Sequence, residues 1–464
     1  MSSIRALKNN SIPGHVFRAY DIRGVVGDDI DEVFAYHLGR AVGSQVYERG
    51  GRRLIVGRDC RLSGLMLQNA LMDGICASGC DVVDIGMCPT PVGYWAIHFL
   101  DADGGVQVTG SHNPPEYNGF KMTLLGSTLH DQHIQALRYR MIAENYVDGK
   151  GTVKERPVTE QYVAALANNL QKPSRPLRVV VDAGNGTGGI TAVPLFKRLG
   201  CEVISLYCEP DGRFPNHEAD PTVEANLQDL RQAVLVNHAD VGLAFDGDAD
   251  RLGVIDRDGA VIFGDRLLTL LSRALLREVP GATIVGEVKC SKSLYDDIRA
   301  HGGRAVMAKT GHSYIKKTIV LENADLAGEM SGHIFYKHRY LGFDDAVYAA
   351  GRLLEILGDG EETITERLND LPETFSTPEI RTLCHEETKF DRVHAVGERV
   401  RAMDLVGVNV IDIDGVRIEW SDGWGLLRAS NTQALLVSRY EASTQRRLEE
   451  IQEFFSKLIH GTMT

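Results

Sequence analysis

Short runs of apolar and β-branched residues recur along the chain, and each is followed by a polar or glycine-containing stretch. Three such runs occupy residues 54–59, 179–184 and 284–289. A second run follows each of them, at 80–86, 201–207 and 304–309. Runs of this length and composition predict β-strands, and the stretches between them, such as 63–78, suit crossover helices. The pattern therefore indicates three copies of an α/β unit.

Each unit then reaches a third apolar run that ends in a polar loop. These runs with their loops occupy residues 106–113, 241–250 and 326–333. Sheets of α/β proteins bind ligands beyond the carboxyl ends of their strands. The three loops are therefore where we expect the chemistry of the protein.

The last part of the chain has a different pattern. Strand-like runs at 407–413, 415–420 and 434–440 precede one amphipathic helix, which Ser443 or Thr444 would cap. A smaller α+β domain fits this order. Polar, turn-rich stretches then divide the chain into four expected domains, at 1–156, 157–259, 260–373 and 374–464.

Composition and charge narrow the possible partners. The chain has 464 residues and a formal net charge of −13, whereas sequence-independent binding of nucleic acid or of anionic membranes needs a surplus of Lys and Arg. We therefore expect small-molecule partners, no nucleic acid and no membrane. The first 14 residues lack the apolar core of a signal peptide, which predicts a cytoplasmic protein. The eight scattered cysteines do not suggest a disulfide framework. Cys76 and Cys80, one helical turn apart, could hold a metal, but buried thiols are expected because no CxxC or paired histidine accompanies them.

The first polar loop, residues 109–121, places Ser111 after a glycine, beside His112 and before two prolines. Prolines stiffen the chain, and a rigidly held hydroxyl is what a covalent intermediate requires. Lys121 adds positive charge ten residues further on. An ordinary turn is the alternative, and a serine hydrolase is disfavoured because the chain contains no G-x-S-x-G.

The second loop has the sequence Asp246-Gly-Asp-Ala-Asp-Arg251, with carboxylates at alternate positions. Three carboxylates lie close together only when a cation neutralises them, and oxygen ligands favour Mg²⁺ or Ca²⁺. An EF-hand would need glycine at the sixth position and glutamate at the twelfth, where this chain has Arg251 and Arg257. A solvated acidic turn is the alternative.

Two further loops suit a sugar phosphate. Gly328-Glu-Met-Ser-Gly-His333 alternates acceptors and donors as sugar hydroxyls require, although a surface turn fits equally well. Arg428-Ala-Ser-Asn-Thr432 would cradle a phosphate, because arginine binds phosphate with paired hydrogen bonds. A polar hairpin turn is the alternative for this second loop.

One stretch imitates a dinucleotide-binding motif. Residues 184–189 match G-x-G-x-x-G after a strand, but the acidic residue expected at the end of the next strand is not there. Close packing of a strand against a helix explains these glycines better.

Together with Phe17-Arg-Ala-Tyr-Asp-Ile-Arg-Gly24, the four loops make the chain resemble the α-D-phosphohexomutase superfamily, and within it the bacterial phosphomannomutase/phosphoglucomutase group. The likeness extends over nearly the whole chain. It implies three similar α/β domains with mixed sheets, a C-terminal α+β domain like the TATA-binding protein, and an active site in a central cleft. One departure is Ala249, which replaces the usual glycine of D-G-D-G-D-R and leaves all three carboxylates in place.

The resemblance also implies a role for each matched residue. Ser111 would carry a phosphoryl group and, with Asp246, Asp248 and Asp250, bind one Mg²⁺. Glu329, Ser331 and His333 would hold the sugar, and Arg428, Ser430, Asn431 and Thr432 the substrate phosphate. Further matched positions are Tyr20, Arg23, His112, Lys121, Arg251, Lys289 and His312; Tyr20, Lys289 and His312 would contact substrate, and His112, Lys121, Arg23 and Arg251 would take part in catalysis.

The implied reaction interconverts the 6-phosphates and 1-phosphates of mannose and glucose. It passes through a phosphoserine and a hexose 1,6-bisphosphate, and glucose 1,6-bisphosphate would also activate the enzyme. A monomer is expected. Two other interpretations are a phosphoglucosamine mutase, which usually has G-E-Q-S-G-H where this chain has Met330, and a non-catalytic sugar-phosphate-binding protein, which would not need Ser111 or three carboxylates.

Overall fold

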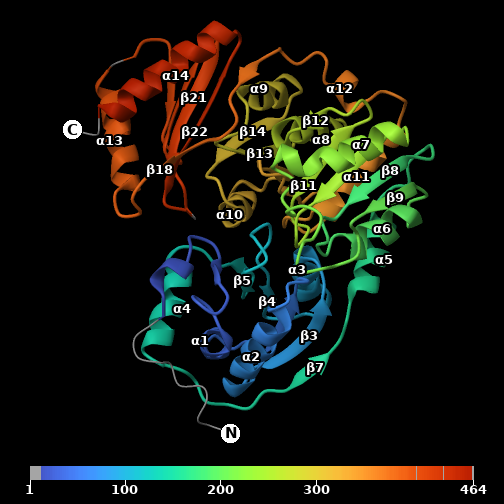
Figure 1. The fold of residues 1–464 in the computed structure, drawn as a ribbon, viewed down its shortest axis with the longest axis vertical. Coiled ribbons are helices and arrows are strands. Elements are labelled where there is room, and N and C mark those ends of the chain that lie inside the picture. The colour runs from blue at the N-terminus through green and yellow to red at the C-terminus, as the bar shows by residue number, and fades with distance from the viewer. Residues whose placement is uncertain (1–11, 404, 432, 462–464) are drawn as a thin grey trace. The chain divides into compact units, whose positions relative to one another are not determined.

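The computed structural model describes residues 12–403, 405–431 and 433–461 (Figure 1). The chain forms two compact units. Unit 1 contains the residues up to Leu267 together with Ser331–Arg367, and unit 2 contains Leu268–Met330 and the chain from Leu368 onward. Thr432, which the sequence places in the phosphate loop, lies outside the described residues.

Unit 1 begins with a mixed sheet of strand order β1-β5-β4-β2-β3-β7, in which β6 also pairs with β5. Its strands are β1 (Ile22–Val25), β2 (Arg53–Arg58), β3 (Asp81–Met87), β4 (Gly104–Val108), β5 (Tyr117–Leu124), β6 (Ser127–Thr128) and β7 (Val153–Glu155). Strands β2, β3, β4 and β7 run parallel, whereas β5 is antiparallel to β4 and to β1. Strand β7 lies next to the expected domain boundary after residue 156, so the chain there forms an edge strand of this sheet as well as a boundary.

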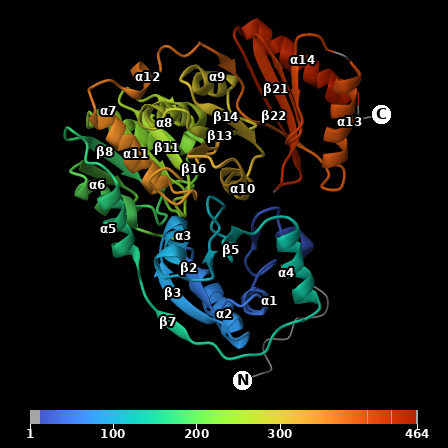
Figure 2. The same cartoon turned by 180° about the vertical axis from the view of Figure 1, so that it is seen from behind.

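Helices flank this sheet, and two of them lie side by side (Figure 1 and Figure 2). The helices are α1 (Glu32–Glu48), α2 (Gly64–Ala77), α3 (Thr90–Phe99) and α4 (Gln132–Ile142), after the short helix η1 (Gly14–Val16). Helices α1 and α2 approach so closely that a Cβ on Gly39 would lie 2.1 Å from the carbonyl oxygen of Leu71. Glycine is therefore needed at this contact.

The second sheet of unit 1 has the order β12-β11-β10-β8-β9. Its strands are β8 (Arg178–Asp182), β9 (Glu202–Leu206), β10 (Val241–Phe245), β11 (Leu252–Asp256) and β12 (Val261–Ile262). Strand β8 is parallel to β9 and β10, and β10 turns back into the antiparallel β11. The remaining elements of this unit are α5 (Thr159–Asn169), α6 (Gly189–Arg198), η2 (Glu224–Leu227), α7 (Gln228–Val236), β16 (Ile334–Tyr336), α11 (Ala346–Gly358) and α12 (Ile364–Arg367).

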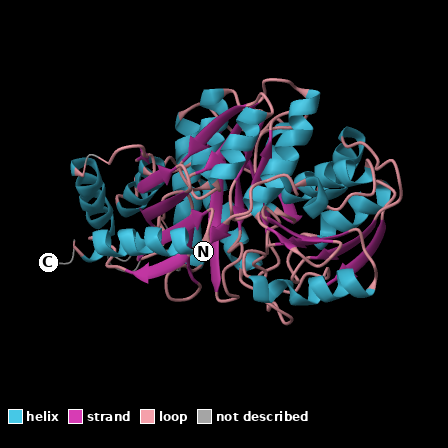
Figure 3. Cartoon of the chain, turned by 90° about the horizontal axis from the view of Figure 1, so that it is seen from above, coloured by secondary structure: helices cyan, strands magenta, loops and turns pink. Residues whose placement is uncertain are grey.

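In unit 2, β13 (Thr283–Glu287) lies between β14 (Arg304–Ala308) and β15 (Leu326–Gly328), and both are parallel to it. The helices of this part are α9 (Lys292–Ala300), α10 (His312–Glu322) and α8 (Gly264–Glu278), whose first turn, up to Leu267, is counted with unit 1. Figure 3 distinguishes strands, in magenta, from helices, in cyan.

The C-terminal part of unit 2 is an antiparallel sheet of order β17-β22-β21-β20-β19, in which β18 also pairs with β22. Its strands are β17 (Phe375–Ser376), β18 (Ile380–Leu383), β19 (Asn409–Ile411), β20 (Val416–Trp420), β21 (Gly423–Ala429) and β22 (Leu435–Ala442), and its helices are α13 (Lys389–Ala402) and α14 (Gln445–His460). Thr444 caps α14 by accepting a hydrogen bond from the amide of Arg447 at 3.2 Å, as the sequence predicts.

All eight cysteines are free thiols. Cys80 is buried, as the sequence predicts, whereas Cys76 is only half-buried. Among the described residues, no helix is both long enough and apolar enough to cross a membrane.

Candidate active site

Ser111 lies in the loop that joins β4 to β5, and it is almost wholly buried. Its backbone has φ 49°, in the left-handed region that residues other than glycine rarely adopt. Its Oγ donates a hydrogen bond to Asp246 Oδ2 at 2.7 Å and lies 3.1 Å from His112 Nδ1. Strain of this kind, about 1–3 kcal/mol per residue, gathers at functional sites, so Ser111 is a strong candidate nucleophile.

The three carboxylates lie in the turn between β10 and β11, and all are completely buried. One oxygen of each of Asp246, Asp248 and Asp250 lies within 4.8 Å of the others. Burial, followed by the charges of Asp248 and Asp250, raises the pKa of Asp246 well above its usual value. Asp248 Oδ1 is buried and has no hydrogen-bond partner among the described residues. This donor set fits a divalent cation that prefers oxygen ligands.

Two cationic or ionisable side chains contact the carboxylates. Lys121, on β5, donates to Asp248 at 2.7 Å and also to Asp250. Burial lowers the pKa of Lys121, but the nearby carboxylates outweigh burial and leave the pKa above its usual value. His333 Nε2 lies 3.1 Å from Asp250 Oδ1, and Asp344 joins these two residues in a second buried cluster.

The backbone near the carboxylates also departs from ordinary geometry. Ala249 has φ 55°, so the position where the superfamily usually has glycine does adopt the left-handed conformation that favours glycine. A Cβ on Gly186 would lie 2.7 Å from the Cα of Gly247, so the glycines at 184–189 allow one loop to pack against the other. The close packing predicted for that glycine motif is therefore present, but at Gly186 it joins two loops rather than a strand and a helix.

Arg23 and His112 lie beside the serine. Arg23, on β1, donates to Asp21 at 2.6 Å and to the side chain of Asn113. Burial lowers the pKa of His112 well below its usual value, and the charges of Arg251 and Arg23 lower it further. Tyr20, immediately before Asp21, is half-buried.

Three residues of unit 1 contact this site although the sequence analysis did not identify them. Thr90, which begins α3, donates from its amide to the carbonyl of Asp248 at 2.9 Å and from its hydroxyl to the carboxylate. Asp59 and Arg61 follow β2 and contact the serine loop. Their position beyond the carboxyl end of a parallel strand was the signal that could have identified them.

A second group of predicted residues lies in unit 2. Glu329 Oε1 accepts a hydrogen bond from the amide of Gly311 at 2.6 Å, immediately before His312 begins α10. Lys289 donates to Glu379 at 2.6 Å and lies 3.4 Å from Glu287. The charge of Lys289 lowers the pKa of Glu379 to about 2.

The predicted phosphate loop also lies in unit 2, but it begins later than the sequence indicates. Arg428 is buried within β21, opposite Val437 of β22, and its Nε donates to Asp414 at 3.0 Å. The β-pairing of β21 keeps Arg428 in the strand, and the turn itself starts at Ser430. Asn431 Nδ2 lies 3.5 Å from the carbonyl of Thr310.

The predicted sugar loop divides between the two units. Glu329 belongs to unit 2, whereas Ser331 and His333 belong to unit 1. Within unit 1, Ser331 Oγ lies 3.1 Å from His333 Nδ1, on the opposite side of the ring from Asp250. His333 therefore contacts the acidic cluster, a contact that the sequence alone did not suggest.

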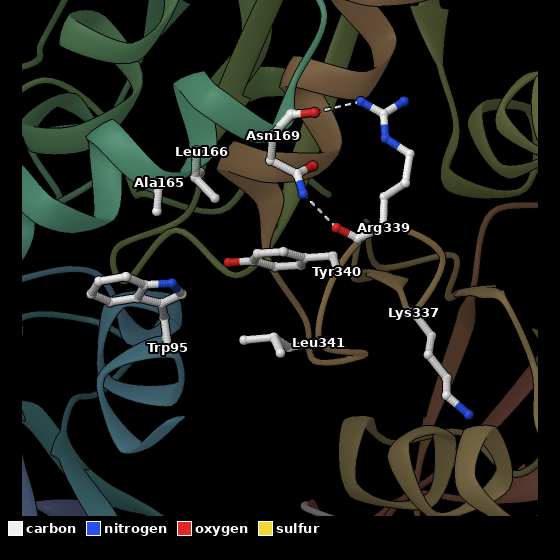
Figure 4. Close-up of a pocket in the computed structure, with 8 residues that line it drawn as sticks. All are labelled: Trp95, Ala165, Leu166, Asn169, Lys337, Arg339, Tyr340 and Leu341. Atoms are coloured by element: carbon white, nitrogen blue, oxygen red, sulfur yellow. Dashed lines mark hydrogen bonds between the residues drawn. The ribbon is translucent and has the colours of Figure 1, made fainter. Parts of the chain in front are cut away.

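Unit 1 also has a hollow with a volume of about 340 Å³ (Figure 4). It is lined by Trp95, Ala165, Leu166, Asn169, Lys337, Arg339, Tyr340 and Leu341. Asn169 Nδ2 donates a hydrogen bond to the carbonyl of Arg339, and Arg339 Nη2 donates one to the carbonyl of Asn169, both at 2.6 Å. The lining has no residue in common with the serine and aspartate loops, which remain the candidate active site.

Models of known protein families match nearly the whole length of the chain. Four successive family models match it, described as phosphoglucomutase/phosphomannomutase α/β/α domain I (residues 14–147), domain II (160–259), domain III (263–375) and C-terminal domain (379–458). The chain is 46% identical to the phosphomannomutase/phosphoglucomutase of Pseudomonas aeruginosa over 448 residues, which are 97% of this chain and 96% of that one. It is 45% identical to a phosphoglucomutase of Neisseria meningitidis over 454 residues, covering 97% and 98% of the two chains.

Comparison with solved structures points to the same family. A crystal structure of a phosphoglucomutase/phosphomannomutase family protein from Burkholderia thailandensis has a TM-score of 0.91 and 43% identity, and the match covers 98% of each chain. The predicted fold class, three similar α/β domains and a smaller C-terminal domain, is confirmed, and it is that of the α-D-phosphohexomutase superfamily. Within that superfamily, this chain belongs to the phosphoglucomutase/phosphomannomutase family.

Proposed function

We propose that the chain is a hexose phosphate mutase, an isomerase, that acts on mannose and glucose phosphates with Ser111 as the phosphoryl carrier. The observation that carries this proposal is the contact of 2.7 Å between the strained Ser111 and Asp246, within a buried cluster of three carboxylates. Relatives named phosphomannomutase/phosphoglucomutase and phosphoglucomutase support hexose phosphate mutase activity.

In the proposed reaction, phosphorylated Ser111 gives its phosphoryl group to the free hydroxyl of a hexose monophosphate. The bond between Ser111 Oγ and phosphorus breaks, the sugar oxygen forms the new bond to phosphorus and loses its proton, and Ser111 Oγ gains a proton. The hexose 1,6-bisphosphate then reverses its orientation, and Ser111 takes the other phosphoryl group. His112, 3.1 Å from Ser111 Oγ, and Lys121 both remain candidates to carry the protons.

Asp246, Asp248 and Asp250 would hold Mg²⁺, with an oxygen of Ser111 among the further ligands. A hard cation held by these carboxylates would supply positive charge to the phosphoryl group during transfer. Lys121 contributes charge to the same place, because it contacts two of the three carboxylates. Arg23 holds Asn113 and so supports the serine loop. Arg251, at the end of the aspartate loop, is proposed to take part in catalysis.

The other residues implied by the resemblance would hold the rest of the substrate. Glu329 would accept hydrogen bonds from hydroxyls that glucose and mannose share, and Lys289, His312 and Tyr20 would complete the contacts with the sugar phosphate. Arg428, Ser430, Asn431 and Thr432 would bind the phosphate that does not react. A crystal structure of N-acetylphosphoglucosamine mutase from Aspergillus fumigatus contains glucose 1,6-bisphosphate, the bisphosphate proposed here as intermediate and activator.

The substrate assignment is tested with the full chain, Mg²⁺ and a trace of glucose 1,6-bisphosphate. Mannose 1-phosphate, glucose 1-phosphate and glucosamine 1-phosphate are each supplied in turn. We expect turnover of the mannose and glucose compounds. Preference for glucosamine 1-phosphate would favour the phosphoglucosamine mutase interpretation, and tight binding without turnover would favour a non-catalytic sugar-phosphate-binding protein.

Arg428→Ala is expected to raise KM about 10- to 100-fold for mannose and glucose substrates alike. A hydrogen bond to a charged group contributes about 1.5–3 kcal/mol, and both sugars present the same phosphate. Steady-state kinetics with both sugars measure the effect, and Arg446→Ala, an exposed arginine of the same domain, is the matched control. A change confined to one sugar would show that Arg428 does not bind the shared phosphate.

A further inference from the structure

Arg61 makes several hydrogen bonds to the backbone around Ser111, although it has no role in the proposed reaction. Its side chain is completely buried, and its guanidinium has five N–H donors, all of which have acceptors. Nη1 donates to the carbonyls of Pro114 and Tyr117, Nη2 donates to those of Ser111 and Asn113, and Nε donates to Asp59. Four backbone carbonyls, three in the loop and one at the first residue of β5, therefore converge on a single side chain.

We propose that Arg61 is a positioning residue that holds the loop of Ser111 in the conformation required for phosphoryl transfer. The proposal rests on the proposed function for what Ser111 does, and on the hydrogen bonds above for how the loop is held. In this proposal Arg61 acts through the backbone of the loop and does not contact substrate.

Asp59 holds the start of the same loop through hydrogen bonds of its carboxylate. It accepts hydrogen bonds from the amide and Nε of Arg61, from the hydroxyl of Thr109 at 2.8 Å and from the amide of Gly110 at 3.2 Å. A buried arginine without a partner would be strongly unfavourable, and the carboxylate of Asp59 compensates its charge. The pair therefore fixes the chain both before and after Ser111.

Steric contacts show that the loop is built around this guanidinium. A Cβ on Gly110 would lie 2.5 Å from both Cζ and Nε of Arg61, so any residue larger than glycine would displace the arginine. A Cβ on Gly247, in the aspartate loop, would lie 2.4 Å from the carbonyl oxygen of Ser111. The carbonyl of Ser111 thus packs between Arg61 and Gly247, which sets the distance from its hydroxyl to Asp246.

The first test compares Arg61→Lys with Arg352→Lys, which replaces another buried arginine of unit 1. Lysine has three donors and no planar fork, so it cannot hold four carbonyls and Asp59 at once. We expect Arg61→Lys to lower kcat about 100-fold, as a displacement of about 1 Å can, with KM changed less than about threefold. Arg352→Lys should leave kcat within about twofold.

Amide hydrogen exchange measures the loop itself, whether or not the variant is active. The amides of Asn113 and Tyr117 donate within the loop, to the carbonyls of Gly110 and Pro114, at 3.0 Å. In Arg61→Lys, we expect both amides to exchange at least about tenfold faster, while those of Val106 and Val108 on β4 keep their protection. Equal loss of protection across β4 would mean that Arg61 only stabilises the fold, and would overturn the proposal.

A double-mutant cycle tests the same contact without relying on lysine. Gly110→Ala alone should lower kcat to a similar extent, because its methyl group displaces the guanidinium. In an Arg61→Ala background, Gly110→Ala should cost less than about a further threefold, because the clash is gone. Additive effects of the two substitutions, or an Arg61→Lys protein with unchanged kcat and a protected loop, would overturn the proposal. If instead the unaltered protein has no mutase activity, the proposed function fails, and the exchange of the loop amides still decides whether Arg61 holds the loop.

Discussion

Ser111→Ala is expected to lower kcat for mannose 1-phosphate and glucose 1-phosphate by about 10³-fold or more. The substitution removes the only oxygen of this residue that can carry the phosphoryl group, and loss of a nucleophile usually costs about this much. The methyl group fits the same buried position, so the thermal unfolding midpoint should change by only a few degrees. Coupled assays for both sugars measure the rate, and intact-mass measurement should show no bound phosphate.

Two further serine variants sharpen this result. Ser127→Ala changes an exposed serine of the same sheet and should leave kcat within about twofold. Ser111→Thr keeps the hydroxyl but places a β-branched residue where φ is 49°, a conformation that such residues avoid, so it should also lose most activity. A Ser111→Ala protein that keeps more than a tenth of the activity would contradict the assigned role.

Asp248→Asn is expected to lower kcat roughly 100-fold and to raise the concentration of free Mg²⁺ needed for half-maximal activity. Removal of one preorganised charged group from such a site costs about 10²–10³ in rate. Asp248 is completely buried, contacts Lys121 and Thr90, and keeps one oxygen available for a cation, so asparagine changes both charge and ligand strength. Activity and calorimetric binding are measured over a range of free Mg²⁺.

The control for this variant is Asp258→Asn, an exposed aspartate in the turn between β11 and β12. It should respond to Mg²⁺ as the unaltered protein does. Excess chelator should abolish activity in both proteins, and added Mg²⁺ should restore it. Full activity in chelator would contradict the assignment of the aspartate loop to a metal.

Local pattern was enough to predict strands that contain an uninterrupted apolar run, such as β2 and β10. Strand β21 was missed because its sequence, Gly423-Trp-Gly-Leu-Leu-Arg-Ala429, contains two glycines and an arginine that are more typical of a loop. Its conformation depends on pairing with β20 and β22 on both sides, which a local pattern does not reveal. Helix α13 was missed because its buried apolar residues, Val393, Val396 and Val400, are few among many charges.

The limits of local sequence pattern also explain which site residues could be predicted from the sequence. Ser111 and the three aspartates stand in short motifs whose chemistry is evident from neighbouring positions. Arg61 and Thr90 act across long stretches of sequence, and only the fold brings them to the serine and aspartate loops. The domain boundaries, a monomeric state and a cytoplasmic location stay predictions.

The most direct test of the account follows one phosphoryl group. The protein is first phosphorylated with glucose 1,6-bisphosphate that carries radioactive phosphorus, and the labelled peptide is mapped. It is then mixed rapidly with an excess of unlabelled glucose 1-phosphate and quenched at short times. The account predicts label on Ser111 alone, which leaves the protein at least as fast as kcat and appears first in hexose bisphosphate and then in hexose 6-phosphate. Label on another residue, or label that stays on the protein while substrate turns over, would contradict it.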